Sequence, residues 1–117
     1  LEIALKKYNC TIKDFTVAPL YMKNGKKGKH EWMIEFVKEP NSIDEFMREI
    51  DFQIQNNNSD YKAKRFKNIT LDRPRLIKAR KNLFYDWLKK KKRLGGQNKV
   101  PRLLNERSFI EELIEMN

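Results

Sequence analysis

Two stretches of alternating apolar and polar residues, one on each side of an Asn-Gly turn, constrain the fold of this chain most strongly. In residues 31–37, large apolar side chains take every second position: Trp32, Ile34 and Phe36. The positions between them carry Glu31, Met33 and Glu35. This alternation is typical of a strand with one buried face. Residues 11–21 alternate similarly, and Pro19 favours an edge or a bulge there. Because Asn24-Gly25 is a strong hairpin signal, we predict an antiparallel hairpin.

A capping box marks the clearest helix, which begins after Pro40. Ser42 is followed three residues later by Glu45, so that each side chain satisfies a backbone N–H of the first turn. The apolar stripe of this helix consists of Ile43, Phe46, Met47, Ile50 and Ile54. Helical spacing also predicts an opening helix that ends near Asn9.

Two more helices are expected in the second half of the chain. The first has an apolar face made of Leu83, Phe84, Trp87 and Leu88. The last opens at Asn105 or Ser108 and buries Phe109, Ile110, Leu113 and Ile114. On or near the outer face of this last helix, we expect the carboxylates to be solvated surface charge: Glu106, Glu111, Glu112 and Glu115.

The order of the elements predicts the fold class. Residues 69–80 resemble a third strand, which Pro74 weakens and places at an edge of the sheet. Helix, two strands, helix, strand and two helices indicate an α+β domain. We expect a small antiparallel sheet with helices packed on one face, of the ferredoxin-like kind. At 117 residues the chain is one domain by size.

Charge and cysteine usage limit the functional classes. A net charge of +10 indicates an anionic partner, which is phosphate, nucleic acid or an acidic protein face. The single cysteine, Cys10, excludes an internal disulfide and fits a reducing compartment such as the cytoplasm. We expect it to be a small buried hydrophobe. His30 is the only histidine, and no cysteine or carboxylate cluster has ligand spacing, so no metal site is expected.

Two interpretations remain for the basic run Lys89–Arg93. It is either a solvated helix end, favourable against the negative end of the helix dipole, or a nucleic-acid patch. A ferredoxin-like sheet that binds RNA exposes aromatic side chains on an open face. The candidates for such stacking are Phe15, Tyr21, Tyr61 and Tyr85. A basic ferredoxin-like nucleic-acid-binding module is therefore the alternative function.

The segment GGQNKVPR, residues 95–102, has the composition of a presenting arm. Gly95-Gly96 permit backbone geometries that are closed to other residues and can end a helix. Pro101 stiffens the chain and biases Val100 to an extended conformation. Lys99 is then a long cation on a semi-rigid segment, suited to a phosphate or to a developing negative charge. Because one lysine on a surface does little alone, this chemistry requires a second surface.

Several strings in the chain resemble one family. GGQNKVPR, preceded by FYDWL and followed by NERSFIEEL, resembles the carboxy-terminal domain of the GH3 family, named for auxin-responsive genes. CTIKDFTVAP, HEWMIEF and NSDYKAKR resemble the bacterial branch of the same domain. The resemblance covers roughly residues 8–117, and the shared order and spacing of the strings make it specific.

The resemblance implies a part of an adenylate-forming ligase. Such enzymes activate a carboxylic acid with ATP and Mg²⁺ to an acyl-adenylate, and many pass the acyl group to an amine or amino acid. Their amino-terminal domain binds ATP and the acid, and the carboxy-terminal domain is a mobile lid. We therefore expect residues 1–117 to be a lid domain, inactive alone, that was cut from a longer chain.

The resemblance also implies the site residues. Lys99 matches the lysine that reaches the α-phosphate region of ATP, with Gln97 and Arg102 as its neighbours. Tyr61, Lys62 and Arg65 match a YRxxR string of the plant domains, without an assigned role. The amino-terminal adenylation domain and the small-molecule acid and amine are the expected partners, whereas a membrane and nucleic acid are not. The identities of the acid and the acceptor stay open.

Overall fold

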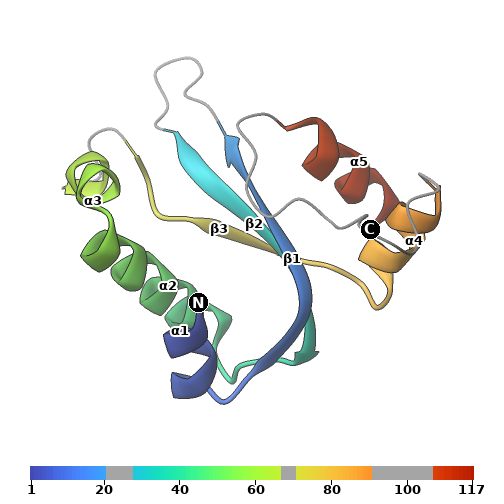
Figure 1. The fold of residues 1–117 in the computed structure, drawn as a ribbon, viewed down its shortest axis with the longest axis horizontal. Coiled ribbons are helices and arrows are strands. Elements are labelled where there is room, and N and C mark those ends of the chain that lie inside the picture. Colours follow the sequence, from blue (N-terminus) through green and yellow to red (C-terminus); the bar gives the residue numbers. More distant parts are fainter. Residues whose placement is uncertain (21–27, 67–70, 91–106) are drawn as a thin grey trace.

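The computed structural model describes residues 1–20, 28–66, 71–90 and 107–117 (Figure 1). The elements in chain order are α1 (Glu2–Lys7), β1 (Thr11–Leu20), β2 (Lys29–Lys38), α2 (Ile43–Asn57), α3 (Ser59–Arg65), β3 (Arg75–Lys78), α4 (Leu83–Lys90) and α5 (Ser108–Met116). The mixture of helices with a small three-stranded sheet confirms the predicted α+β class.

The sheet has the order β1-β2-β3, with β2 at its centre. β1 and β2 pair antiparallel, with Val17 opposite Trp32, which confirms the pairing predicted for the hairpin strands. The Asn24-Gly25 turn itself lies outside the described residues. Register shifts near Thr11 and Ile12 show that β1 is irregular at its start rather than at Pro19.

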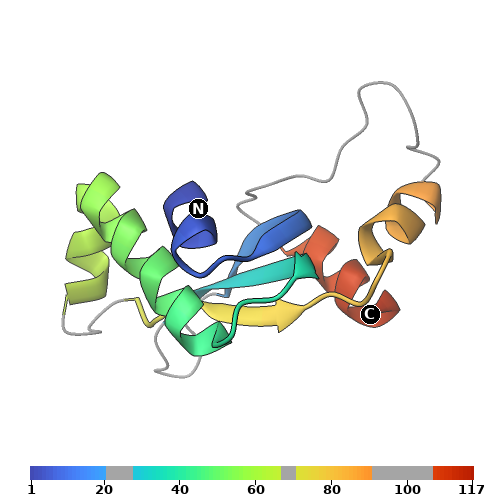
Figure 2. The ribbon, with the colours of Figure 1, turned by 90° about the horizontal axis from the view of Figure 1, so that it is seen from below.

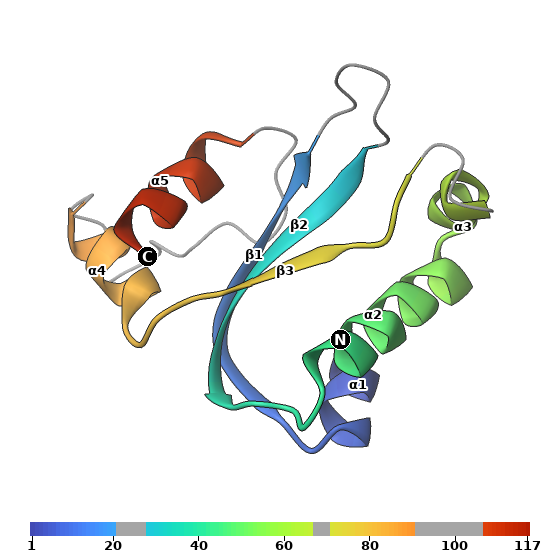
Figure 3. The ribbon, with the colours of Figure 1, turned by 180° about the vertical axis from the view of Figure 1, so that it is seen from behind.

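The prediction of an antiparallel sheet is wrong for the third strand. β3 is an edge strand, as expected, but it runs parallel to β2, with Trp32 opposite Leu76. The connection between β2 and β3 contains α2 and α3, and it crosses one face of the sheet before the chain re-enters (Figure 3). Such a crossover returns the chain to the end where the previous strand began, so that the next strand runs in the same direction.

Helices cover both faces of the sheet, whereas the sequence predicted helices on one face only. Figures 1 and 2 show α1, α2 and α3 on one side of the sheet and α4 and α5 on the other. The first core contains Ala4, Cys10, Val17, Trp32, Ile34, Phe46, Met47 and Ile50. The second contains Ala18, Met33, Leu83, Phe84, Trp87, Ile110 and Leu113. Alternate residues of β2 therefore enter different cores, and Glu31 through Glu35 are all buried.

Local capping explains where the helices begin. The Oγ of Ser42 accepts a hydrogen bond from the Glu45 N–H at 3.2 Å, as the capping-box pattern predicts. Asn58 separates α2 from α3, and its side-chain oxygen accepts the Tyr61 N–H at 3.0 Å. α5 begins at Ser108, one of the two predicted starts. Among these helices, none is long and apolar enough to cross a membrane.

Candidate functional site

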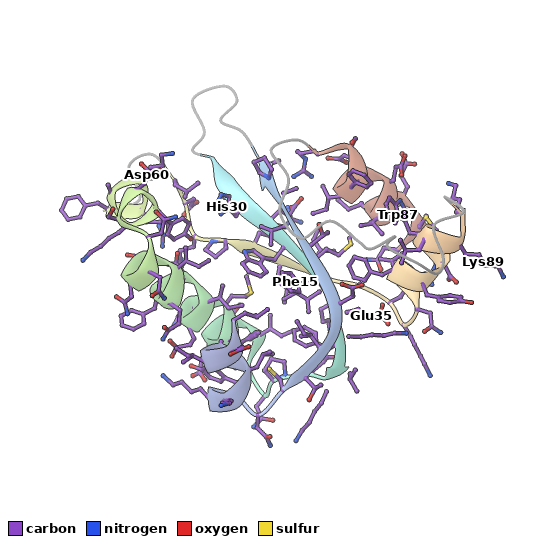
Figure 4. The ribbon with its side chains drawn as sticks, viewed as in Figure 1. Phe15, His30, Glu35, Asp60, Trp87 and Lys89 are labelled. Carbon is purple, nitrogen blue, oxygen red and sulfur yellow. The ribbon has the colours of Figure 1, made fainter. Side chains whose placement is uncertain are left out.

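The arm predicted to carry the chemistry lies outside the described residues. Lys99, Gln97 and Arg102 all fall in residues 91–106, so their roles stay predictions. The structure does describe both flanks of that segment. α4 ends at Lys90 before it, and Arg107 precedes α5 after it. Lys89 and Lys90 are exposed, and Figure 4 shows Lys89 at the outer side of α4.

Both flanks are fastened to β2 by buried glutamates. Glu31 and Glu35 are each only 3% exposed, although their alternation with apolar residues predicted a solvent-facing row. Both side chains lie on the face that α4 and α5 cover, because Met33, between them, belongs to that core. A buried carboxylate is stable only when charges or hydrogen-bond donors compensate it. The groups that bind Glu31 and Glu35 therefore show how the two flanks of residues 91–106 are held.

Arg107 is the main partner of Glu31. Its Nη2 lies 2.7 Å from Glu31 Oε1, and its Nη1 donates to the Pro19 carbonyl at 3.1 Å. Its Nε donates to Glu111 Oε1 at 2.7 Å. One guanidinium thus joins β1, β2 and α5. Burial alone would lower the pKa of Arg107, but the hydrogen bonds to Glu31 and Glu111 outweigh it and raise that pKa, so the residue stays charged.

Glu35 holds the other flank, at the start of α4. Its Oε2 accepts the backbone N–H of Asn82 at 2.8 Å, one residue before the helix begins (Figure 4 labels Glu35). Asn82 has a positive φ of 65°, a conformation that asparagine tolerates better than most residues. Lys13 Nζ donates to Asn82 Oδ1 at 2.8 Å and lies 3.7 Å from Glu35 Oε2. The turn that leads into α4 is therefore fixed to β1 and β2.

The two flanking helices are also tied to each other. Trp87 is fully buried, and its Nε1 donates to Glu112 Oε2 at 2.8 Å. Its ring packs edge-on against Phe109, with centroids 5.1 Å apart. Glu112 is therefore a structural acceptor, and the expectation that it is solvated surface charge was wrong. Glu111, which is exposed, pairs with Arg107.

A second buried network involves two of the three residues whose role the sequence left open. Tyr61 donates its hydroxyl to Asp51 Oδ1 at 2.6 Å. Arg65 binds both oxygens of the same carboxylate, with Nε at 2.8 Å from Oδ1 and Nη2 at 2.7 Å from Oδ2. Nη1 of Arg65 reaches the Leu71 carbonyl at 3.1 Å, whereas Lys62 is exposed. This network lies among α2, α3 and the chain that leads into β3.

The electrostatics of this network favour a structural role. Burial alone would raise the pKa of Asp51, but the hydrogen bonds from Arg65 and Tyr61 outweigh it and lower that pKa. Burial, together with the Asp51 carboxylate, raises the pKa of Tyr61 well above its ordinary range, so the phenol stays protonated. His30 stacks on Tyr61 at 5.6 Å, and burial lowers its pKa, helped by Lys64.

The aromatic residues do not form a stacking platform in the part of the chain that the structure describes. Phe15 stacks on Trp32 within the first core, with centroids 5.6 Å apart, and Tyr61 is buried. Tyr85 is half exposed on α4, and Tyr21 lies outside the described residues. Because helices cover both faces of the sheet, the open surface that RNA-binding sheets present is missing over these ranges.

The structure also shows the environment of Cys10 and of the side chains that could bind a metal ion. Cys10 is buried in the first core as a free thiol, as expected. Within residues 1–20, 28–66, 71–90 and 107–117, no group of three or more His, Cys, Asp or Glu side chains could hold a metal ion.

A groove of about 450 Å³ between α2 and β3 is lined by charges of both signs, among them Arg48, Arg73 and Asp72. Among the described residues, its lining contains no Ser, Thr, Cys or His side chain.

Comparison with known proteins decides the family. The model of the GH3 family C-terminal domain matches residues 1–108. The chain belongs to the GH3 family. Its GH3 C-terminal domain also has the fold of solved relatives. AtGH3.15 acyl acid amido synthetase in complex with 2,4-DB superposes with a TM-score of 0.70 at 15% identity, over 97% of this chain and 21% of that chain.

A second solved structure, GH3.15 acyl acid amido synthetase, agrees with the first. It gives a TM-score of 0.69 at 18% identity, over 97% of this chain and 20% of that chain. The GH3 domain thus spans about a fifth of the length of these synthetases. A sequence comparison with curated proteins gives no match.

Sequence reasoning missed Glu31, Glu35 and Arg107 in this GH3 domain. The available signal was Met33, a large apolar residue in the row that otherwise carries the two glutamates. An apolar residue in the polar row of a strand indicates that this row is covered as well. Arg107 had no comparable signal, because its partner Glu31 lies 76 residues away.

Proposed function

We propose that this domain is the mobile C-terminal part of a GH3-like ligase that activates a carboxylic acid with ATP and transfers the acyl group to an amine or amino acid. The observation that carries the proposal is the match of the GH3 C-terminal domain over residues 1–108, which include Lys99. The shared fold with two acyl acid amido synthetases supports it. The free Cys10 fits an enzyme of the reducing cytoplasm.

The proposed reaction has two steps. A carboxylate oxygen attacks the α-phosphorus of ATP, the bond to the bridging oxygen breaks, and pyrophosphate leaves. The amine then attacks the acyl carbonyl carbon, and AMP leaves with the electrons of the acyl–oxygen bond while the amine loses a proton. We assign to Lys99 the stabilisation of negative charge on the α-phosphate oxygens in the first step. Gln97 and Arg102 are its proposed neighbours.

This role requires a second domain. The described residues supply no enclosed pocket with convergent catalytic groups, and a lysine charge has its full effect only when water is excluded. We therefore propose an amino-terminal adenylation domain of the same polypeptide as the partner that binds ATP and the acid. The Mg²⁺ that accompanies ATP is assigned to that domain as well, because the described residues offer no suitable donor set. Alone, residues 1–117 are then inactive.

The test is a lysine replacement in the full-length ligase. Pyrophosphate exchange into ATP is measured with a panel of carboxylic acids together with 2,4-DB, the compound bound in one relative. With the acid that gives the fastest exchange, Lys99→Ala should lower the rate about a hundredfold or more. Lys89→Ala, an exposed lysine on α4, is the matched control and should keep the normal rate. Normal exchange by Lys99→Ala, or exchange with no acid at all, would reject the proposal.

A further inference from the structure

The groove between α2 and β3 gathers cations from different parts of the chain. Arg48 comes from α2, Arg73 from the chain that leads into β3, and Lys29 from the start of β2. Within the described residues, none of these three cations forms an ion pair. Arg75, which also lines the groove, lies 3.6 Å from Glu31, and its side chain is 61% exposed. The groove therefore presents positive charge that the described part of the fold leaves largely uncompensated.

The carboxylates of the same groove do not cancel this charge. Asp51 is already bound by Arg65, which lies outside the lining. Asp44 is exposed in the first turn of α2, where the positive end of the helix dipole favours it. Asp72 accepts the backbone N–H of Arg73 at 2.8 Å. With Asp51 compensated, four basic side chains face two acidic ones, so the groove favours an anionic ligand.

The edge strand β3 also has main-chain groups that can pair with a ligand. Alternate residues of an edge strand direct their N–H and C=O away from the sheet. The Ala79 N–H points inward, because it donates to the Ile34 carbonyl of β2. The Lys78 carbonyl points outward and accepts the side chain of Asn117 at 3.1 Å. By the same alternation Leu76, which lines the groove, turns its N–H and C=O outward.

The side chains of β3 set the pattern that a paired peptide would need. Leu76 packs against the first core, and Met47 of α2 lies in that core and also lines the groove. Arg75 instead lies beside Glu31, on the opposite face of the sheet. Successive side chains of an extended peptide also point to opposite faces. A segment of alternating apolar and acidic residues therefore matches Leu76 on one face and Arg75 on the other.

We propose that this groove binds an acidic, extended peptide segment of a partner protein, which pairs with β3 at Leu76 and is held by the arginines of the groove. In such strand addition, main-chain hydrogen bonds give affinity and alternate side chains give specificity. A nucleic-acid backbone fits less well, because Asp44 and Asp72 would repel its phosphates. This binding does not depend on the proposed ligase activity.

The test begins with a displayed library of random ten-residue peptides, selected against the full-length protein. The selected sequences should be enriched in Asp and Glu at every second position, with apolar residues between them. A selected peptide is then synthesised with a fluorescent label, and anisotropy measures its Kd. A selection that enriches no peptide, or only peptides without acidic residues, would overturn the proposal.

Two arginine variants place the binding in the groove. Arg48→Ala and Arg73→Ala should each raise the Kd of the peptide about threefold to tenfold, because each removes a charge-assisted contact. Both side chains are exposed, so the melting temperature should stay the same. Lys89→Ala is the control: it removes an exposed cation from α4, on the other side of the sheet, and should leave the Kd unchanged. Equal weakening by all three variants would show attraction to the overall charge and refute the groove as the site.

Amide hydrogen exchange distinguishes strand addition from simple anion binding. A saturating concentration of the peptide should slow exchange of the Leu76 amide, which a paired backbone would protect. Inorganic phosphate and a single-stranded oligonucleotide, compared at the same ionic strength, should not protect this amide. Unchanged exchange with the peptide bound, or equal protection by the oligonucleotide, would contradict the proposal.

Discussion

Glu31 and Arg107 form a short ion pair, 2.7 Å from Oε1 to Nη2, between the central strand and the residue that precedes α5. The pair joins parts of the chain 76 residues apart. It also explains why a strand covered on both faces carries an acid at position 31. The two glutamates of β2 hold the α4–α5 layer against the sheet. Glu31 pairs with Arg107, which precedes α5, and Glu35 accepts the N–H of Asn82, which precedes α4.

Glu31 and Glu35 should respond differently to loss of charge. Glu31→Gln should destabilise the fold by about 2 kcal/mol, because Arg107 loses a buried counter-charge. Glu35→Gln should cost less than about 1 kcal/mol, because its amide oxygen can still accept the Asn82 N–H. In addition, Glu35 Oε1 has no hydrogen-bond partner among the described residues. Urea unfolding of the chain measures both values, and equal losses would contradict the assignment of Arg107 as the decisive partner.

The Asp51 network should be a major source of stability. Asp51→Asn leaves Arg65 buried without its counter-charge, and we expect a loss of about 3 kcal/mol or more. Asp60→Asn removes an exposed pair with Lys64 and should cost less than about 1 kcal/mol. Chemical denaturation compares the two variants. A small effect at Asp51 would mean that the pair is not closed in solution.

His30 should make stability depend on pH just below neutrality. Burial lowers its pKa below the ordinary value of 6.5, so the unfolded chain binds this proton more readily than the folded chain. The free energy of unfolding should therefore decrease as the pH falls from 6.5 through the folded-state pKa. The variant His30→Phe keeps a ring against Tyr61 and should lose this decrease. Unfolding curves at several pH values test it, and an unchanged decrease in the variant would assign the effect to other groups.

The hydrogen bond between α4 and α5 should contribute measurably. Trp87→Phe removes the donor to Glu112 and leaves a partly filled space, and we expect a loss of about 1–3 kcal/mol. Tyr85→Phe, on the same helix but half exposed, should change stability by less than about 0.5 kcal/mol. Thermal unfolding followed by circular dichroism suffices. Indistinguishable melting temperatures for the two variants would argue against the contact.

The basic charge of the chain should not produce tight nucleic-acid binding. The described part of the sheet is covered on both faces, and its candidate stacking residues Phe15 and Tyr61 are engaged within the fold. A gel shift with single- and double-stranded probes at near-physiological salt should show no retarded band. A shift that weakens steeply with added salt would instead support the nucleic-acid-binding alternative.

Local signals in the sequence predicted local structure well. The capping box at Ser42 and the alternation in residues 31–37 act over a few residues, and the structure contains both elements as expected. The parallel direction of β3 was missed because strand direction depends on how α2 and α3 cross the sheet.

The candidate site was harder to predict for the same reason. The burial of Glu31 depends on α4 and α5, which come later in the chain. The role of Arg107 can be recognised only when its partner Glu31, 76 residues away in the sequence, is seen beside it. Family resemblance supplied Lys99, a prediction that lies outside the described residues. The roles of Glu31, Glu35 and Arg107 follow from side-chain contacts between distant parts of the chain, which the hydrophobic periodicity of the sequence does not reveal.

The most direct test of the proposed function is single-turnover formation of the acyl-adenylate by the full-length protein, with Lys99 present or replaced by alanine. We expect the replacement to slow the chemical step about a hundredfold while the melting temperature stays the same. Adenylate formation at the normal rate without Lys99 would contradict the claim that this domain delivers a catalytic charge.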